Sequence, residues 1–229
     1  MAKIKPNIFI IFLISILLIF GVYLSFIGGY GSDEDTLPMI YVFERRLGDG
    51  TFVTSRFTGN PVAEMGIGFL SYFFGSFIAN LITFFFFLFG ILFIFIALSK
   101  KKDANLYLFL LLCLSSQVLY FDNLEPIDYS WALFPFGLGF YLLSKKNIEL
   151  AILLLAVSVG ARINFLIFII PMIFLYNYDY KISFYRKIVI FLSVFFVSGL
   201  FYLPIWYDYS FSLEWLTAAR PIGQGFIGI

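Results

Sequence analysis

The chain has 229 residues, of which 62% are hydrophobic and 13% charged, and its formal net charge is +1. This composition, with a mean hydropathy of +0.97, excludes a water-soluble domain and predicts an all-α, polytopic membrane protein. The sequence has no histidine, which excludes imidazole chemistry and histidine-based metal motifs. Its single cysteine, Cys113, excludes a disulfide framework and a thiolate metal site.

The first predicted span covers residues 7–27. No charged residue lies between Lys5 and Asp33, and about 20 apolar residues suffice to cross a bilayer. A cleaved signal peptide is the competing interpretation. The apolar run continues into "GVYLSFIGG" without a small-residue cleavage site, so we interpret it as an uncleaved span.

The loop that follows, residues 28–64, is the longest connection between predicted spans, and such loops usually carry function. Its segment "TLPMIYVFERRL" predicts an amphipathic helix lying on the membrane. The apolar residues spaced for one face of that helix are Leu37, Ile40, Phe43 and Leu47.

Three adjacent acids, Asp33, Glu34 and Asp35, stand before this helix. Repulsion between neighbouring carboxylates raises the pKa of at least one of them, which suits a general base or a metal site. The alternatives are a solvated acidic turn and a helix cap supplied by Asp35.

The remaining spans are predicted within residues 65–207, followed by a tail at 208–229. The uncharged run 65–99 would measure roughly 52 Å as a helix, so it predicts one crossing plus an interfacial or re-entrant piece near residues 66–75. Two short apolar runs flank Arg162 and predict a hairpin there. The uncharged runs after residue 99 are 104–121, 129–144, 150–161, 163–178 and 188–207. We expect about seven membrane-spanning or re-entrant helices in a single transmembrane domain.

Lysines orient the chain, because short cytoplasmic loops carry an excess of Lys and Arg. If all of them lie on the cytoplasmic side, the amino terminus is cytoplasmic and the first loop is extracytoplasmic. The predicted location is the cell membrane, that is, the plasma or inner membrane. These lysines are Lys3, Lys5, Lys100, Lys101, Lys102, Lys145, Lys146, Lys181 and Lys187. Most acids then fall on the outer face, which predicts that the outer loops carry the chemistry or the binding.

A second outer loop contains Asp122, Glu125 and Asp128, and Asp128 is also well placed as the N-cap of the next helix. Arg162 lies in an apolar segment, where insertion of a guanidinium costs roughly 2.5 to 3.5 kcal/mol. It therefore needs an anionic partner or an escape to the surface. A lipid phosphate and a structural carboxylate are both candidate partners.

Four short motifs follow one another along the chain: Asp33-Glu34-Asp35; Ser55-Arg56 through Gly59, with Pro61 and Glu64; Asp128-Tyr129-Ser130-Trp131; and Gly160 to Arg162. Together and in this order they resemble the GT-C membrane glycosyltransferases, a superfamily that includes protein O-mannosyltransferases and aminoarabinose transferases. The chain is similar to about their amino-terminal half. It departs from their usual pattern at Thr58, where family members generally have proline.

The resemblance implies transfer of a sugar from a polyprenyl-phosphate carrier to an acceptor at the extracytoplasmic face, with inversion at the anomeric carbon. It implies that Asp33 is the base and that Arg56 and Arg162 bind the donor phosphate. Glu34 and Asp35 would tune the base or position the acceptor. Glu125 and Asp128 are candidates for binding the acceptor or a divalent metal, and metal dependence is left open.

The expected partners are the lipid-linked donor and membrane lipids, with no nucleic acid. A transporter is the rival interpretation, for which ionisable residues at the midplane or an internal repeat would be expected. A noncatalytic or truncated membrane protein is a further alternative.

Overall fold

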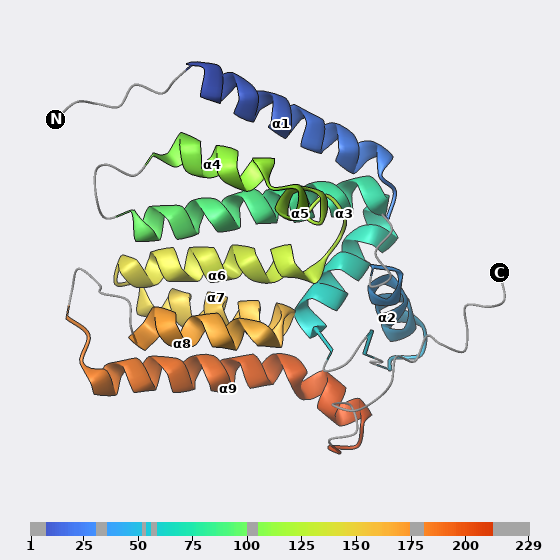
Figure 1. Ribbon diagram of the computed structural model, residues 1–229. Coiled ribbons are helices and arrows are strands. Elements are labelled where there is room, and N and C mark those ends of the chain that lie inside the picture. Colours follow the sequence, from blue (N-terminus) through green and yellow to red (C-terminus); the bar gives the residue numbers. More distant parts are fainter. Residues whose placement is uncertain are drawn as a thin grey trace.

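The computed structural model describes residues 8–30, 36–51, 54–55, 59–99, 105–174 and 181–212 (Figure 1). Within these ranges the chain forms helices and no strands, as the composition predicts. The helices are α1 (Ile8–Ile27), α2 (Thr36–Gly48), α3 (Pro61–Leu98), α4 (Leu106–Ser115), α5 (Gln117–Phe121), α6 (Asp128–Ser144), α7 (Ile148–Ala161), the 3₁₀ turn η1 (Ile163–Phe165), α8 (Leu166–Phe174) and α9 (Phe184–Asp208).

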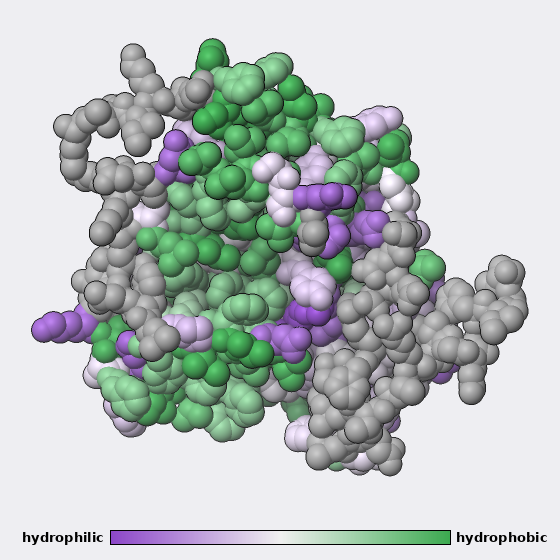
Figure 2. Space-filling model, in the orientation of Figure 1, coloured by the Kyte–Doolittle hydropathy of each residue, from purple (hydrophilic) through white to green (hydrophobic). Residues whose placement is uncertain are grey.

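Three of the described helices are long and apolar enough to cross a membrane: α1 with 20 residues, α3 with 38 and α9 with 25. Shorter apolar helices cover Leu106–Ser115, Ile148–Ala161 and Ile163–Phe174. Hydrophobic residues also dominate the visible outer face of the bundle (Figure 2). An apolar surface this extensive fits lipid and not water. The chain is thus a helical membrane-associated protein, and the count of seven spans stays a prediction.

The two largest groups of buried side chains hold most of the helices together. Leu143, Leu155 and Val194 belong to a core between α6, α7, α8 and α9. Phe84 and Leu114 belong to a second core between α1, α3 and α4. The α3 and α6 helices pack against each other and bring the two cores together.

A sharp bend divides α3 at Gly75, whose φ of 77° and ψ of 178° interrupt the helix. Side chains rarely tolerate this backbone region, which glycine adopts freely. The arm 61–74 leans across the end of the bundle beside α2, whereas the arm 76–98 runs along the other helices (Figure 1). The structure therefore breaks the run 65–99 where the sequence predicted a division. Interfacial placement of the first arm stays a prediction.

The chain also breaks at Arg162, as expected. The α7 helix ends at Ala161, and Arg162 adopts an extended conformation with φ −159° and ψ 112°. The η1 turn and α8 then lead the chain back beside α7 (Figure 1). The predicted hairpin accordingly places Arg162 at one end of the bundle.

Among the described residues, the lysines and most of the acids lie at opposite ends of the bundle. The α6–α7 connection carries Lys145 and Lys146, and Lys181 precedes α9 at the same end (Figure 1). The opposite end carries the α5–α6 turn with Asp122, and the end of α9 with Asp208. The membrane topology, including which end faces the cytoplasm, stays a prediction.

The helix α2 forms where the sequence predicted it, but one residue of its predicted lipid-facing stripe, Phe43, is buried against protein. Leu37 and Leu47 are 49% and 55% exposed, whereas Met39 and Val42 are buried along with Phe43. The reason is a close approach to α3: a Cβ added at Gly68 would lie 2.2 Å from the Cβ of Phe43. Leu37 and Leu47 remain exposed, so placement of this face on lipid stays a prediction.

Candidate functional site

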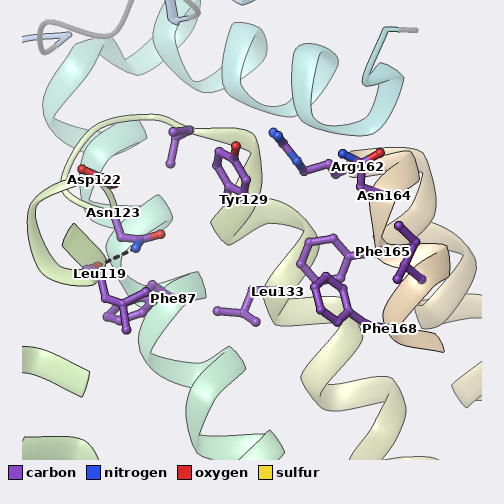
Figure 3. A pocket seen from close by; sticks show the side chains of 12 residues that line it. Phe87, Leu119, Asp122, Asn123, Tyr129, Leu133, Arg162, Asn164, Phe165 and Phe168 are labelled. Carbon is purple, nitrogen blue, oxygen red and sulfur yellow. Dashed lines mark hydrogen bonds between the residues drawn. The ribbon is translucent and has the colours of Figure 1, made fainter. Parts of the chain in front are cut away.

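A cavity of about 790 Å³ opens at the acidic end of the bundle, between the end of α5, the start of α6 and the α7–α8 turn (Figure 3). Polar and apolar residues line different parts of it. In Figure 3 the side chains of Tyr129, Arg162 and Asn164 lie along one edge, and Leu133 and Phe168 lie deeper. The complete lining comprises Phe87, Leu119, Asp122, Asn123, Ile127, Tyr129, Leu133, Arg162, Asn164, Phe165, Ile167 and Phe168. The cavity therefore suits an amphipathic ligand.

Arg162 is held at this edge by an ion pair with Asp128. Its Nη1 atom donates to both carboxylate oxygens of Asp128, at 2.7 Å each. The Asp128 side chain is fully buried, and that of Arg162 is only 16% exposed. Charge-assisted hydrogen bonds of this length are stronger than neutral ones. The ion pair thus fixes the guanidinium beside the cavity.

The ring of Tyr129 lies over one face of the Arg162 guanidinium, with the Cζ atom of Arg162 3.5 Å from the ring centroid. Cations bind favourably over the face of an aromatic ring. Because Tyr129 covers one face and Asp128 occupies Nη1, the Nε and Nη2 edge is the part of Arg162 best placed to bind a ligand. Among the described residues, Arg162 forms hydrogen bonds through Nη1 alone.

Asn60 fixes the other side of the Asp128 carboxylate, donating from Nδ2 to Oδ2 at 2.7 Å. Its position follows from Pro61, because the residue before a proline is disfavoured in a helical conformation. Asn60 accordingly has φ −133° and ψ 68° and makes no side-chain capping bond to α3. Its amide is free to reach across to α6.

The N-cap interpretation of Asp128 is wrong. Ile127 occupies the N-cap position of α6, Asp128 is the first helical residue, and no side chain caps the helix. The carboxylate is directed instead into the contacts with Arg162 and Asn60.

A second buried carboxylate closes the first loop. Glu64, in the first turn of α3, is fully buried and accepts hydrogen bonds from the backbone nitrogen of Ser55, at 3.0 Å, and from the Ser55 hydroxyl. The two residues belong to the motif that carried the family resemblance. In this structure they anchor the end of the loop to α3.

Four predicted site residues, Asp33, Glu34, Asp35 and Arg56, lie outside the described residues. The first described residue after the acids is Thr36, whose hydroxyl donates to the carbonyl oxygen of Pro126 at 3.2 Å. This bond ties the start of α2 to the turn that precedes Asp128.

Of the remaining predicted residues, Asp128 and Arg162 meet in an ion pair beside the cavity. Glu125 is partly exposed and does not line the cavity. Across the described ranges, no group of three or more acidic or cysteine side chains is arranged to hold a metal ion. Metal binding that involves the acids of the first loop is not tested by this geometry.

Sequence reasoning assigned no role to Asn60, Tyr129 or Asn164. The dipeptide Asn60-Pro61 signals a helix start and not a contact with α6. Tyr129 lies next to Asp128 within a motif that was recognised, yet its position over Arg162 depends on the turn between α7 and α8. No pattern in the sequence marked Asn164 as part of a polar edge.

Comparison with known proteins gives no further guidance, since no protein-family model, curated protein or solved structure matches the chain. The resemblance to GT-C glycosyltransferases therefore rests on the sequence motifs alone. The cavity, its ion pair and its apolar wall are independent of that resemblance.

Proposed function

We propose that the protein transfers a sugar from a polyprenyl-phosphate carrier to an acceptor at the extracytoplasmic membrane face, with inversion of the anomeric carbon. The observation that carries this proposal is a cavity with a fixed guanidinium at its edge and a largely apolar wall below it. A lipid-linked sugar phosphate has the same division, with an anionic head and a hydrocarbon tail.

Arg162 supports the head-group part of the proposal. Its Nε and Nη2 edge offers N–H donors in the planar arrangement that binds two phosphate oxygens. Because Asp128 already compensates part of the positive charge, binding depends on geometry as well as on charge. A phosphodiester, with one negative charge, fits such a site better than a highly charged anion.

Phe165 and Phe168 support the lipid part. They lie in the wall of the cavity, on the turn and helix that follow Arg162 directly. The exposed surface of Phe168 and Ile167, at 55% and 67%, faces outward from an apolar helix. A hydrocarbon chain that leaves the cavity along this surface would pass into the bilayer without crossing a polar barrier.

The chemical step needs one base. The acceptor oxygen or nitrogen attacks the anomeric carbon, the bond from that carbon to the phosphate oxygen breaks, and the phosphate keeps the electron pair. The acceptor's proton passes to a carboxylate, which we assign to Asp33. Arg162 stabilises the charge that develops on the leaving phosphate. No general acid is required, because the phosphate leaves as a stable anion.

The connection of α2 to the site supports the choice of Asp33. Asp33 precedes Thr36 by three residues, and Thr36 hydrogen-bonds to Pro126 in the turn that leads to Asp128. The first loop thus returns to the cavity side of the bundle within a short length of chain from the acids. Arg56 is assigned to the donor phosphate by the motif alone.

The test is sugar transfer from a radiolabelled polyprenyl-phosphate sugar in membranes that contain the protein. We expect Asp33→Asn to reduce transfer by about 10²- to 10⁴-fold, the usual contribution of a general base. Glu149→Gln is the matched control, since Glu149 is an exposed acid in the first turn of α7, at the opposite end of the bundle. Undiminished transfer by Asp33→Asn would exclude the assigned base.

Arg162→Lys tests the phosphate site separately. Lysine keeps the charge but loses the planar pair of donors, so we expect weaker donor binding with the acceptor affinity unchanged. Absence of any transfer or donor binding by the unmodified protein would contradict the proposed function as a whole.

A further inference from the structure

We infer that Asp122 is a specificity-determining residue that makes the cavity prefer the glycosylated carrier to the spent carrier phosphate. This inference rests on the proposed function and names the group that distinguishes substrate from product. It comes from the distribution of charge around the cavity opening.

Asp122 and Arg162 lie on opposite sides of the opening, with Tyr129 between them (Figure 3). Asp122 is exposed and lies in the turn after α5, whereas Arg162 lies between α7 and η1. A ligand whose phosphate binds Arg162 therefore presents the rest of its head group toward Asp122. The opening has an anion-binding side and an anion-repelling side.

The turn that carries Asp122 is built to hold its position. The neighbouring Asn123 donates from Nδ2 to the carbonyl oxygen of Leu119 at 2.5 Å and accepts a hydrogen bond from the hydroxyl of Ser130. Both ends of the Asn123 amide are thus used within the protein. Asp122, in contrast, forms no hydrogen bond or ion pair with the other described residues, so its two oxygens are available as acceptors for a ligand.

Two physical effects then separate substrate from product. The sugar of the substrate carries hydroxyl groups, which donate hydrogen bonds to an ionised carboxylate. Asn164, exposed at the same opening beside Arg162, supplies an amide for a further hydroxyl. The spent carrier has no sugar, so it loses these contacts.

The second effect is electrostatic. The substrate is a phosphodiester with one negative charge, whereas the spent carrier is a phosphomonoester with a charge of about −1.5 to −2 at pH 7. The extra charge faces the carboxylate of Asp122 and is repelled by it. Asp122 accordingly favours release of the product after the sugar has left.

The experiment measures binding of two soluble-chain probes, farnesyl phosphate and its glucosyl phosphodiester, to the purified full chain in detergent. The unmodified protein should bind the diester more tightly. Asp122→Asn keeps a hydrogen-bonding group but removes the charge, so it should bind farnesyl phosphate about three- to tenfold more tightly. Asp122→Ala should show the same gain and also lose affinity for the diester.

The pH dependence gives an independent readout. The monoester gains its second charge as the pH rises through about 6, so the unmodified protein should lose affinity for farnesyl phosphate over this range. This loss should be smaller in Asp122→Asn. A general loss of folding would not change this slope. Glu149→Gln is the charge-matched control and should leave both affinities unchanged.

The outcomes separate the two claims. In one outcome the unmodified protein binds the two probes with equal affinity, Arg162→Ala abolishes this binding, and Asp122→Asn has no effect. The specificity inference is then wrong, and the proposed function stands. If the unmodified protein binds neither probe, both are wrong.

Discussion

The contact between α3 and α6 allows a sharp prediction, because glycine permits it. A Cβ added at Gly137 would lie 2.4 Å from the carbonyl oxygen of Gly90 and 3.2 Å from the Gly90 Cα. Ordinary van der Waals contact begins at about 3.4 Å, so Gly137→Ala must force two helix backbones apart. Backbone atoms of a packed helix cannot turn aside as a flexible side chain can.

The magnitude follows from two opposing effects. Alanine in place of glycine stabilises a helix interior by up to about 1 kcal/mol, whereas overpacking costs about 1 to 3 kcal/mol and occasionally more. Separation of the helices also weakens contacts beside the glycine pair, including that of Leu133 with Gly90. We therefore expect Gly137→Ala to destabilise the protein by about 2 kcal/mol, or roughly 4 to 8 °C in unfolding midpoint.

Gly199→Ala is the matched control, because Gly199 is also helical but no atom lies within 4 Å of its added Cβ. It should be neutral or slightly stabilising. Both variants are measured by thermal unfolding in the same detergent. Equal midpoints for the two variants would refute the close backbone contact. Because Leu133 lines the cavity, Gly137→Ala should also weaken binding of the lipid probe.

Two further predictions concern the contacts of the site. Asp128→Ala and Arg162→Ala should each destabilise by about 3 kcal/mol, since each leaves the other charge buried. The double variant should cost less than their sum by about 2 kcal/mol, and strictly additive losses in an unfolding assay would contradict the ion pair. Thr36→Val, which removes the hydrogen bond to Pro126 while keeping the side-chain shape, should cost about 1 to 2 kcal/mol. An unchanged unfolding midpoint for this variant would show that the bond does not hold α2 to the turn.

Those parts of the fold that depend on local sequence could be predicted. The apolar runs indicated the helices because a bilayer requires continuous apolar surface. The length of the run 65–99 and its glycines indicated the division that the structure places at Gly75. The charge of Arg162 within an apolar segment indicated a break in the helix, and the helix ends one residue before it.

Contacts between distant segments could not be predicted in the same way. The spacing in α2 predicted a lipid-facing stripe that included Phe43, and it did not reveal that Gly68 admits Phe43 and Met39 against α3. The role of Asn60 depends on the approach of α3 to α6, which no local pattern encodes. Asp128 was a reasonable N-cap by position, but an arginine from another helix provides a stronger partner than a backbone N–H.

The buried ion pair itself argues for a site and not for a structural contact alone. Burying two charges costs several kcal/mol per ion, and an apolar pair of similar volume is often as stabilising or more so. Between apolar helices such a replacement would be expected if stability were the only requirement. What the pair provides is orientation: Asp128, itself held by Asn60, fixes one side of the Arg162 guanidinium, Tyr129 covers a face, and Arg162 lines the cavity. A guanidinium held in this way can bind a phosphate without first giving up side-chain freedom, which is the condition for effective electrostatic stabilisation of a leaving group.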